Sequence, residues 1–275
     1  SSRFAKNLRA LLPGLRIKMK NINVAETYYS QFGEDRILAE IFNQKTSGLC
    51  VEVGANDGVN DSNTMYFEKA GWNCILVEPN PVLCKMIRAS RSSVLFELAA
   101  SDKAGDVTLF VAEGAERAHG VSTINAGEDE LNKIKSYGFT YREVKVQTKT
   151  LDEILSGLKP GSEIDFISVD VEGHELEVLS GFSLERWRPA VILVEDNSNF
   201  EDAAVSNYLS RFGYFCFKRT GVNDWYAHES NATLVNRLSR CRYNWLAFKG
   251  RVKNKIKKIP GVVKARNFLL NRSVK

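Results

Sequence analysis

The sequence predicts an α/β protein built on a Rossmann-like, doubly wound and mostly parallel sheet with helices on both faces. Apolar runs of strand length alternate along the chain with segments of helical periodicity, which is the pattern of successive βα units. One of these units contains a glycine-rich turn, and several of the runs end in acidic residues. The 275 residues provide for one large domain of this class with additional segments at its ends.

The glycine-rich turn lies in the first unit, Leu49–Gly58, which reads LCVEVGANDG. Its apolar start predicts a buried strand, and its glycines allow the backbone to bend sharply and to approach a ligand closely. A dinucleotide site would require the spacing GxGxxG, but Asn56 and Val59 occupy two of those positions. The spacing E-x-G-x-x-x-G, which begins at Glu52, resembles instead the corner that binds S-adenosylmethionine (SAM) in Rossmann-like methyltransferases. An ordinary glycine-rich βα turn is the alternative.

Two further strands end in acidic residues that suit a nucleoside. The run Asn73–Val77 ends at Glu78, at the distance from the glycine turn where a carboxylate accepts hydrogen bonds from both ribose hydroxyls. The alternative is that Glu78 caps the helix that begins at Pro81. The run Val94–Leu98 leads to Asp102, which suits an adenine amino group or, alternatively, a simple turn.

The middle of the chain predicts two strands, at Asp106–Val111 and Val144–Thr148. The polar, glycine-rich segment Glu113–Gly127 between them is long enough to be a functional loop. Thr150 then caps a predicted helix at Leu151–Leu158.

A second concentration of chemistry follows the predicted buried strand Ile164–Val169. The next six residues, Asp170–Glu175, read DVEGHE and contain four ionisable groups. Such groups are costly to place at the end of a buried strand unless they have partners or a function. The following strand, Ala190–Val194, ends in Glu195 and Asp196, so acidic residues stand at the ends of both strands.

The last two strands are predicted at Phe212–Lys218 and Tyr243–Phe248, as an antiparallel pair at the edge of the sheet. Trp225, Tyr226 and His228 lie between them, and we expect them to border a substrate pocket.

The net charge of +5 is unevenly distributed along the chain. Residues 1–20 contain six Lys/Arg and residues 230–275 contain thirteen, and neither segment contains an acidic residue. The other 19 Lys/Arg and all 33 acidic residues lie in 21–229, which gives that segment a net charge of −14. An acidic body therefore carries two basic ends.

This distribution predicts three parts: a basic amphipathic segment at 1–24, a catalytic domain at 25–250 and a basic tail at 251–275. Apolar residues recur on both sides of Pro260 in the tail, which predicts two short amphipathic helices suited to an anionic membrane surface. The alternatives are a tail that folds onto the acidic body or one that stays disordered. The acidic body disfavours nucleic acid as a partner.

The sequence contains no run of 18 apolar residues, and its N-terminus lacks the apolar core of a signal peptide. The five cysteines are scattered and never spaced as CxxC, so we interpret them as reduced side chains. We expect a cytoplasmic protein, peripheral on the inner face of the membrane if the tail binds lipid.

Several motifs together resemble the FkbM-type SAM-dependent methyltransferases over residues 28–248. The matching segments are SQFGED (30–35), VEVGANDG (51–58), VEPN (77–80), AASDKAG (99–105), GVST (120–123), TKTLDEIL (148–155), IDFISVDVEGHELEVLSG (164–181) and VEDN (194–197). The block DVEGHE after an apolar strand is the most specific of them. The resemblance implies a seven-stranded sheet flanked by helices, and often O-methylation of sugars or polyketide-type hydroxyls.

The resemblance also implies roles for individual residues. The contacts with the methionine part of SAM would be Glu52, Gly54, Asn56 and Gly58. Glu78 would bind the ribose and Asp102 the adenine side, and Asn80 and Ser101 of the same motifs join the cofactor-binding candidates. Asp170 would face the methyl group, and it forms the catalytic candidates together with His174 and Glu172.

A weaker similarity concerns magnesium-dependent O-methyltransferases, in which acidic residues at two adjacent strand ends hold the metal. Asp170, Glu195 and Asp196 are the corresponding candidates in this chain, since Mg²⁺ prefers hard oxygen ligands. Such an ion would bind two vicinal hydroxyls and lower the pKa of one. The alternative is a cradle of carboxylates that binds a sugar without an ion.

The expected activity is SAM-dependent O-methylation of a sugar, a glycan or a related natural product, including lipid-linked glycans. The alternatives are a methyltransferase of a non-sugar acceptor and a SAM-binding, membrane-docked scaffold without catalysis. A nicotinamide oxidoreductase is disfavoured by the missing GxGxxG.

Overall fold

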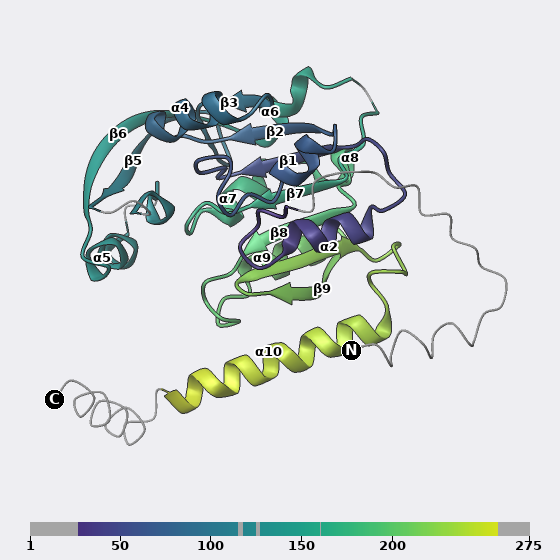
Figure 1. Cartoon of the computed structure of the whole chain (residues 1–275). Coiled ribbons are helices and arrows are strands. Elements are labelled where there is room, and N and C mark those ends of the chain that lie inside the picture. The colour runs from purple at the N-terminus through teal and green to yellow at the C-terminus, as the bar shows by residue number, and fades with distance from the viewer. Residues whose placement is uncertain (1–26, 115–117, 125–126, 160, 258–275) are drawn as a thin grey trace.

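The structure is a computed structural model and describes residues 27–114, 118–124, 127–159 and 161–257. A central sheet with the strand order β3-β2-β1-β7-β8-β10-β9 runs through the body (Figure 1). Its strands are β1 (Leu49–Val53), β2 (Asn73–Val77), β3 (Val94–Phe96), β7 (Phe166–Val169), β8 (Val191–Glu195), β9 (Tyr214–Thr220) and β10 (Asn223–His228). The first five strands of that order are parallel, and β10 runs antiparallel to both of its neighbours. The predicted seven-stranded, mostly parallel sheet is confirmed.

Helices cover both faces of this sheet. Its central strands are apolar and almost completely buried, as the continuous runs of the sequence predict. One face packs against α6 (Leu151–Ile154), α7 (Glu175–Ser180), α8 (Leu184–Trp187) and α9 (Ala204–Ser210). The other face packs against α2 (Glu34–Ile41), α3 (Met65–Lys69) and α4 (Pro81–Ser90). The carboxyl ends of the parallel strands are thereby left at an edge between two helical layers.

Thr150 begins α6 with the capping box that its sequence predicts. Its side chain accepts a hydrogen bond from the backbone N–H of Glu153 at 3.1 Å, and the Glu153 carboxylate accepts from the backbone N–H of Thr150 at 2.8 Å. The predicted helix Leu151–Leu158 is divided into α6 and the 3₁₀ turn η2 (Leu155–Gly157).

A second sheet projects from the body as a curved arm (Figure 1). It has the order β4-β6-β5 and consists of β4 (Ala99–Ala100), β5 (Gly105–Glu113) and β6 (Thr140–Lys149). The 3₁₀ turn η1 (Ala118–Val121) and α5 (Glu128–Ser136) lie between β5 and β6 in the chain. The two strands predicted in the middle of the sequence therefore form a sheet of their own.

The strand predicted at Tyr243–Phe248 is wrong, because these residues belong to the helix α10 (Arg237–Lys257). The partner of β9 is β10, reached through a tight turn at Gly221. In the run YNWLAF, Ala247 is buried while Trp245 and Phe248 are exposed. The apolar residues are thus divided between two faces of a helix, an arrangement that a short apolar run does not distinguish from a strand.

Helix α10 continues through residue 250, the predicted end of the catalytic domain. The predicted N-terminal segment 1–24 and the tail beyond residue 257 lie outside the described residues. Within the described ranges, no helix is both long enough and apolar enough to cross a bilayer.

Gly54, directly after β1, has a backbone φ of +81°, and an added Cβ would stand 1.7 Å from the carbonyl oxygen of Asp170. We expect Gly54→Ala to lower the free energy of unfolding by at least about 3 kcal/mol, because strain in the left-handed region adds to a clash with backbone. Gly71 is the matched control, since it has a φ of +87° and nothing within 4 Å of an added Cβ. Gly71→Ala should cost only about 1–2 kcal/mol. Equal losses in urea unfolding would contradict the role assigned to the contact with Asp170.

Candidate active site

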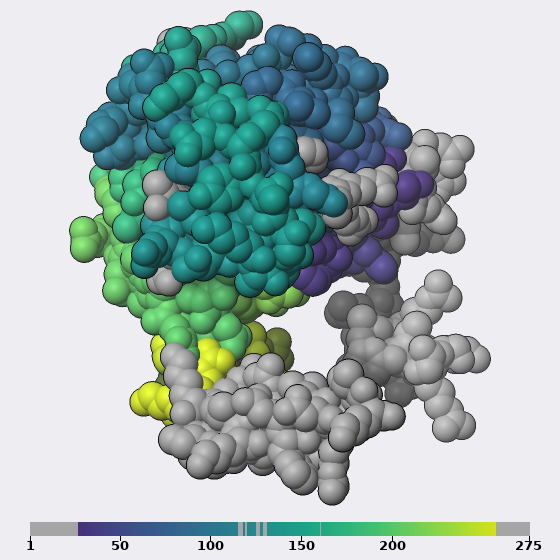
Figure 2. Space-filling model, turned by 90° about the vertical axis from the view of Figure 1, so that its left-hand side faces the viewer, coloured from purple at the N-terminus to yellow at the C-terminus, as the bar shows by residue number. Residues whose placement is uncertain are grey.

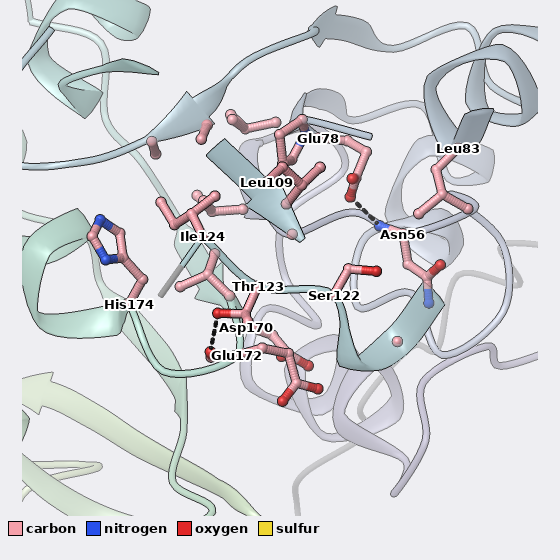
Figure 3. Close-up of a pocket in the computed structure, with 18 residues that line it drawn as sticks. Asn56, Glu78, Leu83, Leu109, Ser122, Thr123, Ile124, Asp170, Glu172 and His174 are labelled. Carbon is pink, nitrogen blue, oxygen red and sulfur yellow. Dashed lines mark hydrogen bonds between the residues drawn. The ribbon is translucent and has the colours of Figure 1, made fainter. Parts of the chain in front are cut away.

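A pocket opens at the carboxyl edge of the sheet, where β1, β2 and β7 end (Figure 3). The strand ends and the turns after them form its floor, and residues 120–124 of the arm close it from the other side. The lining residues are Val53, Gly54, Asn56, Val77, Glu78, Pro79, Leu83, Ala99, Ala100, Leu109, Gly120, Ser122, Thr123, Ile124, Asp170, Val171, Glu172 and His174. Its polar groups stand at both ends of a largely apolar surface, as expected for a small-molecule site.

Glu78 lies where the sequence predicts a ribose ligand. One carboxylate oxygen accepts a hydrogen bond from the backbone N–H of Asn56 at 2.9 Å, and the other accepts from the backbone N–H of Asn80 at 2.8 Å. Burial raises the pKa of Glu78 to about 7, although these two N–H donors lower it. A buried carboxylate with so few donors has unused acceptor capacity toward the pocket.

Glu52 and Gly58 do not line the pocket. The Glu52 carboxylate accepts hydrogen bonds from the Ser62 hydroxyl at 2.8 Å, the Thr64 hydroxyl at 2.5 Å and the backbone N–H of Asn63 at 2.6 Å. Burial is the main cause that raises the pKa of Glu52. Glu52 therefore holds the loop at Ser62–Thr64 in place and does not face the pocket.

The structure also separates the other cofactor-binding candidates from the pocket wall. Asn80 caps α4, because its side-chain oxygen accepts from the backbone N–H of Val82 at 3.0 Å. Its side-chain nitrogen is buried and has no hydrogen-bond partner among the described residues. Ser101 is buried behind the wall and is hydrogen-bonded to His174 Nε2 at 3.0 Å. Asp102 is exposed outside the pocket.

The loop after β7 carries the catalytic candidates and is held in an unusual backbone conformation. Glu172 has a φ of +53° and Gly173 a φ of +95°. The Glu175 carboxylate accepts hydrogen bonds from the backbone N–H groups of Gly173 at 3.0 Å and of Val171 at 3.3 Å, which fixes this turn. His174 lines the pocket, but its imidazole turns away from the two acidic side chains (Figure 3). Burial lowers the pKa of His174, so its ring is neutral at pH 7.

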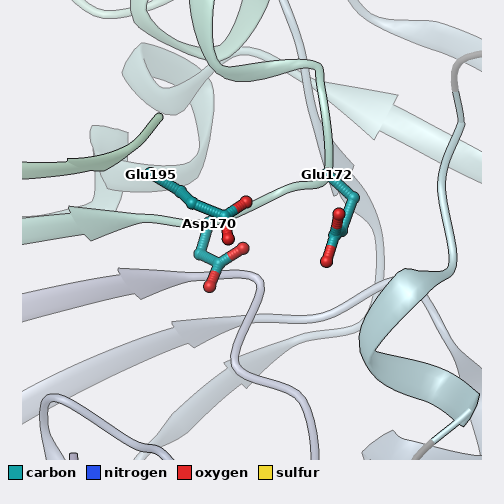
Figure 4. Close-up of side chains that lie close together, drawn as sticks. All are labelled: Asp170, Glu172 and Glu195. Carbon is teal, nitrogen blue, oxygen red and sulfur yellow. The ribbon is translucent and has the colours of Figure 1, made fainter. Parts of the chain in front are cut away.

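Asp170, Glu172 and Glu195 converge at one point (Figure 4). One carboxylate oxygen from each lies within 4.8 Å of the other two. Desolvation and then repulsion from Glu195, Glu172 and Glu175 raise the pKa of Asp170 well above its usual range. Burial, followed by repulsion from Glu172 and Glu175, raises the pKa of Glu195 to about 7.

Asp196, the third metal candidate from the sequence, is not part of this group. Its carboxylate accepts a hydrogen bond from Arg219 Nη1 at 2.8 Å and another from the backbone N–H of Phe200 at 3.1 Å. Arg219 also pairs with the buried Asp224 at 2.9 Å. Glu172 takes the place that the sequence analysis gave to Asp196.

A second, more polar cleft adjoins the first pocket at the loop after β7. Gly173 and Glu175 of that loop and Glu195 at the end of β8 lie on its border. The opposite walls are the loop after β8, α9, β10 and α10. The polar side chains on these walls belong to Asp196, Asn197, Ser198, Asp202, Ser206, Asn207, Asp224, Asn244 and Arg251, and the aromatic ones to Phe200, Tyr226 and Tyr243. Of the aromatic residues expected at a substrate pocket, only Tyr226 lines it, because Trp225 is buried in the core and His228 lies outside it.

The arm supplies two residues that the sequence analysis missed. Lys133 Nζ of α5 pairs with the Glu172 carboxylate at 2.5 Å. The Thr123 hydroxyl donates to the backbone carbonyl of Glu172 at 2.9 Å, and Thr123 itself exchanges two backbone hydrogen bonds with Phe110 of β5. The motif GVST did point to residues 120–123, but only the folded arm brings Lys133 to the acidic group.

A glycine turn, an acidic residue at the end of the second strand and a sheet whose reversed strand, β10, lies next to its edge are typical of a Rossmann-like methyltransferase. The family model described as the methyltransferase FkbM domain matches residues 52–216, which is more than half of the chain. The chain belongs to this FkbM methyltransferase family, and the resemblance stated from the sequence is confirmed. Membership implies SAM as the methyl donor.

Among solved structures, the chain is similar to precorrin-6y C5,15-methyltransferase from Geobacter metallireducens GS-15, with 12% identity and a TM-score of 0.34 over 70% of this chain and 84% of that one. It is also similar to a chain of the fibrillarin/Nop5p complex, with 12% identity and a TM-score of 0.36 over 72% of this chain and 83% of that one. A comparison with curated proteins found no match.

Glu195 predicts a dependence of stability on pH. Its pKa of about 7 in the folded chain exceeds the ordinary value of 4.5, so its contribution is complete below about pH 4.5 and is lost as the pH rises through about 7. Glu195→Gln has no carboxyl group at this position and should not lose this stability. Between pH 4.5 and pH 8, the free energy of unfolding of the wild type should therefore fall relative to that of Glu195→Gln by as much as about 3 kcal/mol. Urea unfolding in EDTA measures the difference. Glu143→Gln, at an exposed site on β6, is the control, and a Glu195→Gln difference that does not change with pH would contradict the assignment.

Proposed function

We propose that this chain is a SAM-dependent O-methyltransferase that acts on a hydroxyl of a sugar, a glycan or a related natural product. The observation that supports it most is the position of the acidic group. Asp170 and Glu172 line the first pocket and Glu195 borders the second, so the three carboxylates stand between a donor site and an acceptor site.

The first pocket fits SAM in its donor set. Glu78 presents a buried carboxylate to hydroxyl donors, and the side-chain nitrogen of Asn80 behind it is buried without a partner among the described residues. Leu83, Ala99 and Leu109 offer an apolar surface for a base. When bound, SAM supplies a methyl group activated by a sulfonium. Gly54 and Asn56 lie at the turn that would hold its amino-acid part.

Asp170 is the best-placed base for the acceptor hydroxyl. Asp170 lines the first pocket, and its carboxylate lies beside that of Glu195, which borders the second, so it stands where an acceptor hydroxyl would meet the donor. The neutral His174, held by Ser101, is the second candidate. Glu172 is paired with Lys133, and its role is to position the loop and to complete the acidic group.

The acidic group also fits Mg²⁺. Three carboxylate oxygens within 4.8 Å of one another are hard ligands, and a divalent ion would relieve the repulsion that raises the pKa values of Asp170 and Glu195. An ion held by Asp170, Glu172 and Glu195 would supply Lewis acidity toward an acceptor hydroxyl. Asp196 has no place in this set, because it is engaged by Arg219.

The second cleft supports a hydroxyl-rich acceptor. Amide, hydroxyl and carboxylate side chains alternate with aromatic ones along its walls, which suits hydrogen bonds to a sugar together with stacking on its apolar face.

The donor site is tested by calorimetry with SAM. We expect Glu78→Ala to weaken binding by about 1–3 kcal/mol, because it removes a buried acceptor from the ribose hydroxyls. Glu143→Ala, at an exposed site on β6, should bind SAM as the wild type does. An unchanged affinity in Glu78→Ala would remove Glu78 from the ribose role.

The reaction is tested by incubating the protein and SAM with a panel of glycans and polyhydroxylated natural products and measuring S-adenosylhomocysteine. With an active acceptor, Asp170→Asn should lower turnover by about 10²–10⁴-fold, as expected for the loss of a general base. If Mg²⁺ is required, EDTA abolishes turnover. In that case Mg²⁺ raises the melting temperature of the wild type and of Asp196→Asn, but not of Glu195→Gln. Equal turnover in EDTA and in Mg²⁺ would leave the carboxylates as ligands of the sugar alone.

A further inference from the structure

Helix α10 exposes a continuous apolar stripe. Leu238, Cys241, Trp245, Phe248 and Val252 recur at intervals of three and four residues, so they lie on one face of the helix, and Ile256 extends it. All six side chains are exposed, with Trp245 at 61% and Phe248 at 60%. A contiguous exposed row of this kind indicates an interaction surface.

The opposite face of α10 fastens the helix to the body. The Tyr243 hydroxyl donates to the Asp224 carboxylate at 2.8 Å, and Ala247 is buried. Gly250 faces Phe200 so closely that an added Cβ would stand 2.4 Å from its ring. Asn254 exchanges hydrogen bonds with Asn199, at 2.7 Å and 3.1 Å. The stripe therefore points away from the protein, and α10 lies at the edge of the body (Figure 2).

The charge of α10 is of one sign. The helix contains eight Lys/Arg and no acidic residue. Arg242, Lys249 and Lys253 are exposed on one side of the stripe, and Lys249 Nζ lies 4.1 Å from the centre of the Trp245 ring. An apolar face with tryptophan, bordered by basic residues, is the pattern of a helix that lies in a membrane interface.

We propose that the stripe of α10 docks the protein on an anionic lipid bilayer. Eight positive charges on each helix disfavour a second copy of α10 as the partner, since two copies would repel each other without any acidic side chain to pair with. A nucleic acid would use the basic residues but leave the apolar stripe uncovered, whereas an anionic bilayer matches both.

Docking through α10 would also bring the second cleft to the membrane. Tyr243, Asn244, Ala247 and Arg251 line that cleft from the inner face of the same helix. On the proposed function, the acceptor would then be a hydroxyl-bearing head group carried by a lipid. The stripe covers residues 238–256, so the docking surface lies within the described helix and does not depend on the residues beyond 257.

The protein contains its own reporter for this contact. Of its four tryptophans, Trp72, Trp187 and Trp225 are buried, and only Trp245 is exposed. We expect the emission of the full-length protein to shift to shorter wavelength when vesicles of phosphatidylglycerol and phosphatidylcholine are added at low salt. Pure phosphatidylcholine vesicles should give no shift, and salt should reduce it. Trp245→Phe should still sediment with anionic vesicles but lose the shift.

Sedimentation with the same vesicles tests the stripe itself. The double variant Trp245→Ser/Phe248→Ser should require about tenfold more lipid for half-binding, because it removes two large apolar side chains from the interface. The matched control is Val94→Ser/Tyr137→Ser, which removes two apolar side chains that are 58% exposed each, on β3 and after α5. For the charges, Lys249→Glu/Lys253→Glu should lose binding, and the exposed pair Lys85→Glu/Lys159→Glu should not.

Three results would overturn the proposal: no shift of the Trp245 emission, equal sedimentation of the stripe variant and the wild type, or a concentration-dependent dimer that only the stripe variant abolishes. The last result would assign the stripe to a second copy. SAM calorimetry on Trp245→Ser/Phe248→Ser separates membrane docking from SAM binding, because this variant should bind SAM as the wild type does. If the wild type does not bind SAM, the proposed function is refuted and the docking result is unaffected.

Discussion

The close approach of β1 and β7 holds together the strand ends on which the site is built. The backbone N–H of Asp170 donates to the carbonyl of Val53 at 3.0 Å, and the next residue after β1, Gly54, packs against the carbonyl of Asp170. On its other side, Gly54 donates its backbone N–H to Val77 at 2.9 Å. One glycine thus joins the strand that ends at Glu78 to the strand that ends at Asp170. A side chain at this position would force Glu78 and Asp170, at the two ends of the pocket, apart.

The second constraint is electrostatic. Asp170, Glu172, Glu195 and Glu175 are crowded at one edge, and burial together with repulsion between these carboxylates raises the pKa values of Asp170 and Glu195. Lys133 compensates only part of this charge. A fold selected for stability alone would not concentrate carboxylates here, so the cost is expected at a functional site, where the protein forgoes stability for chemistry.

The parts of the site that the sequence predicted follow from the geometry of parallel sheets. Asp170 and Glu195 end adjacent strands, and such ends meet at one edge. Asp196 lies outside this group for an equally simple reason, since consecutive residues of an extended chain point in opposite directions and Glu195 already faces the group. Glu52 follows the same rule, because its neighbours Val51 and Val53 point into the core cluster on the other face of β1. The same reasoning could not predict Lys133 and Thr123, because the second sheet and the segments between its strands bring them to the group.

Helix α10 shows why composition alone misplaces a boundary. The predicted boundary at residue 250 falls inside this helix, and the inner face of α10 holds the loop after β8, in which Asn199 and Phe200 have φ values of +53° and +70°. Non-glycine residues keep such a conformation only when their surroundings hold them. Phe200 lies between Tyr243 of α10 and the Arg219 guanidinium, which stands 4.2 Å from the centre of its ring. The wall of the second cleft is therefore built partly from the helix that carries the apolar stripe, so any force that moves α10 relative to the sheet acts directly on that wall.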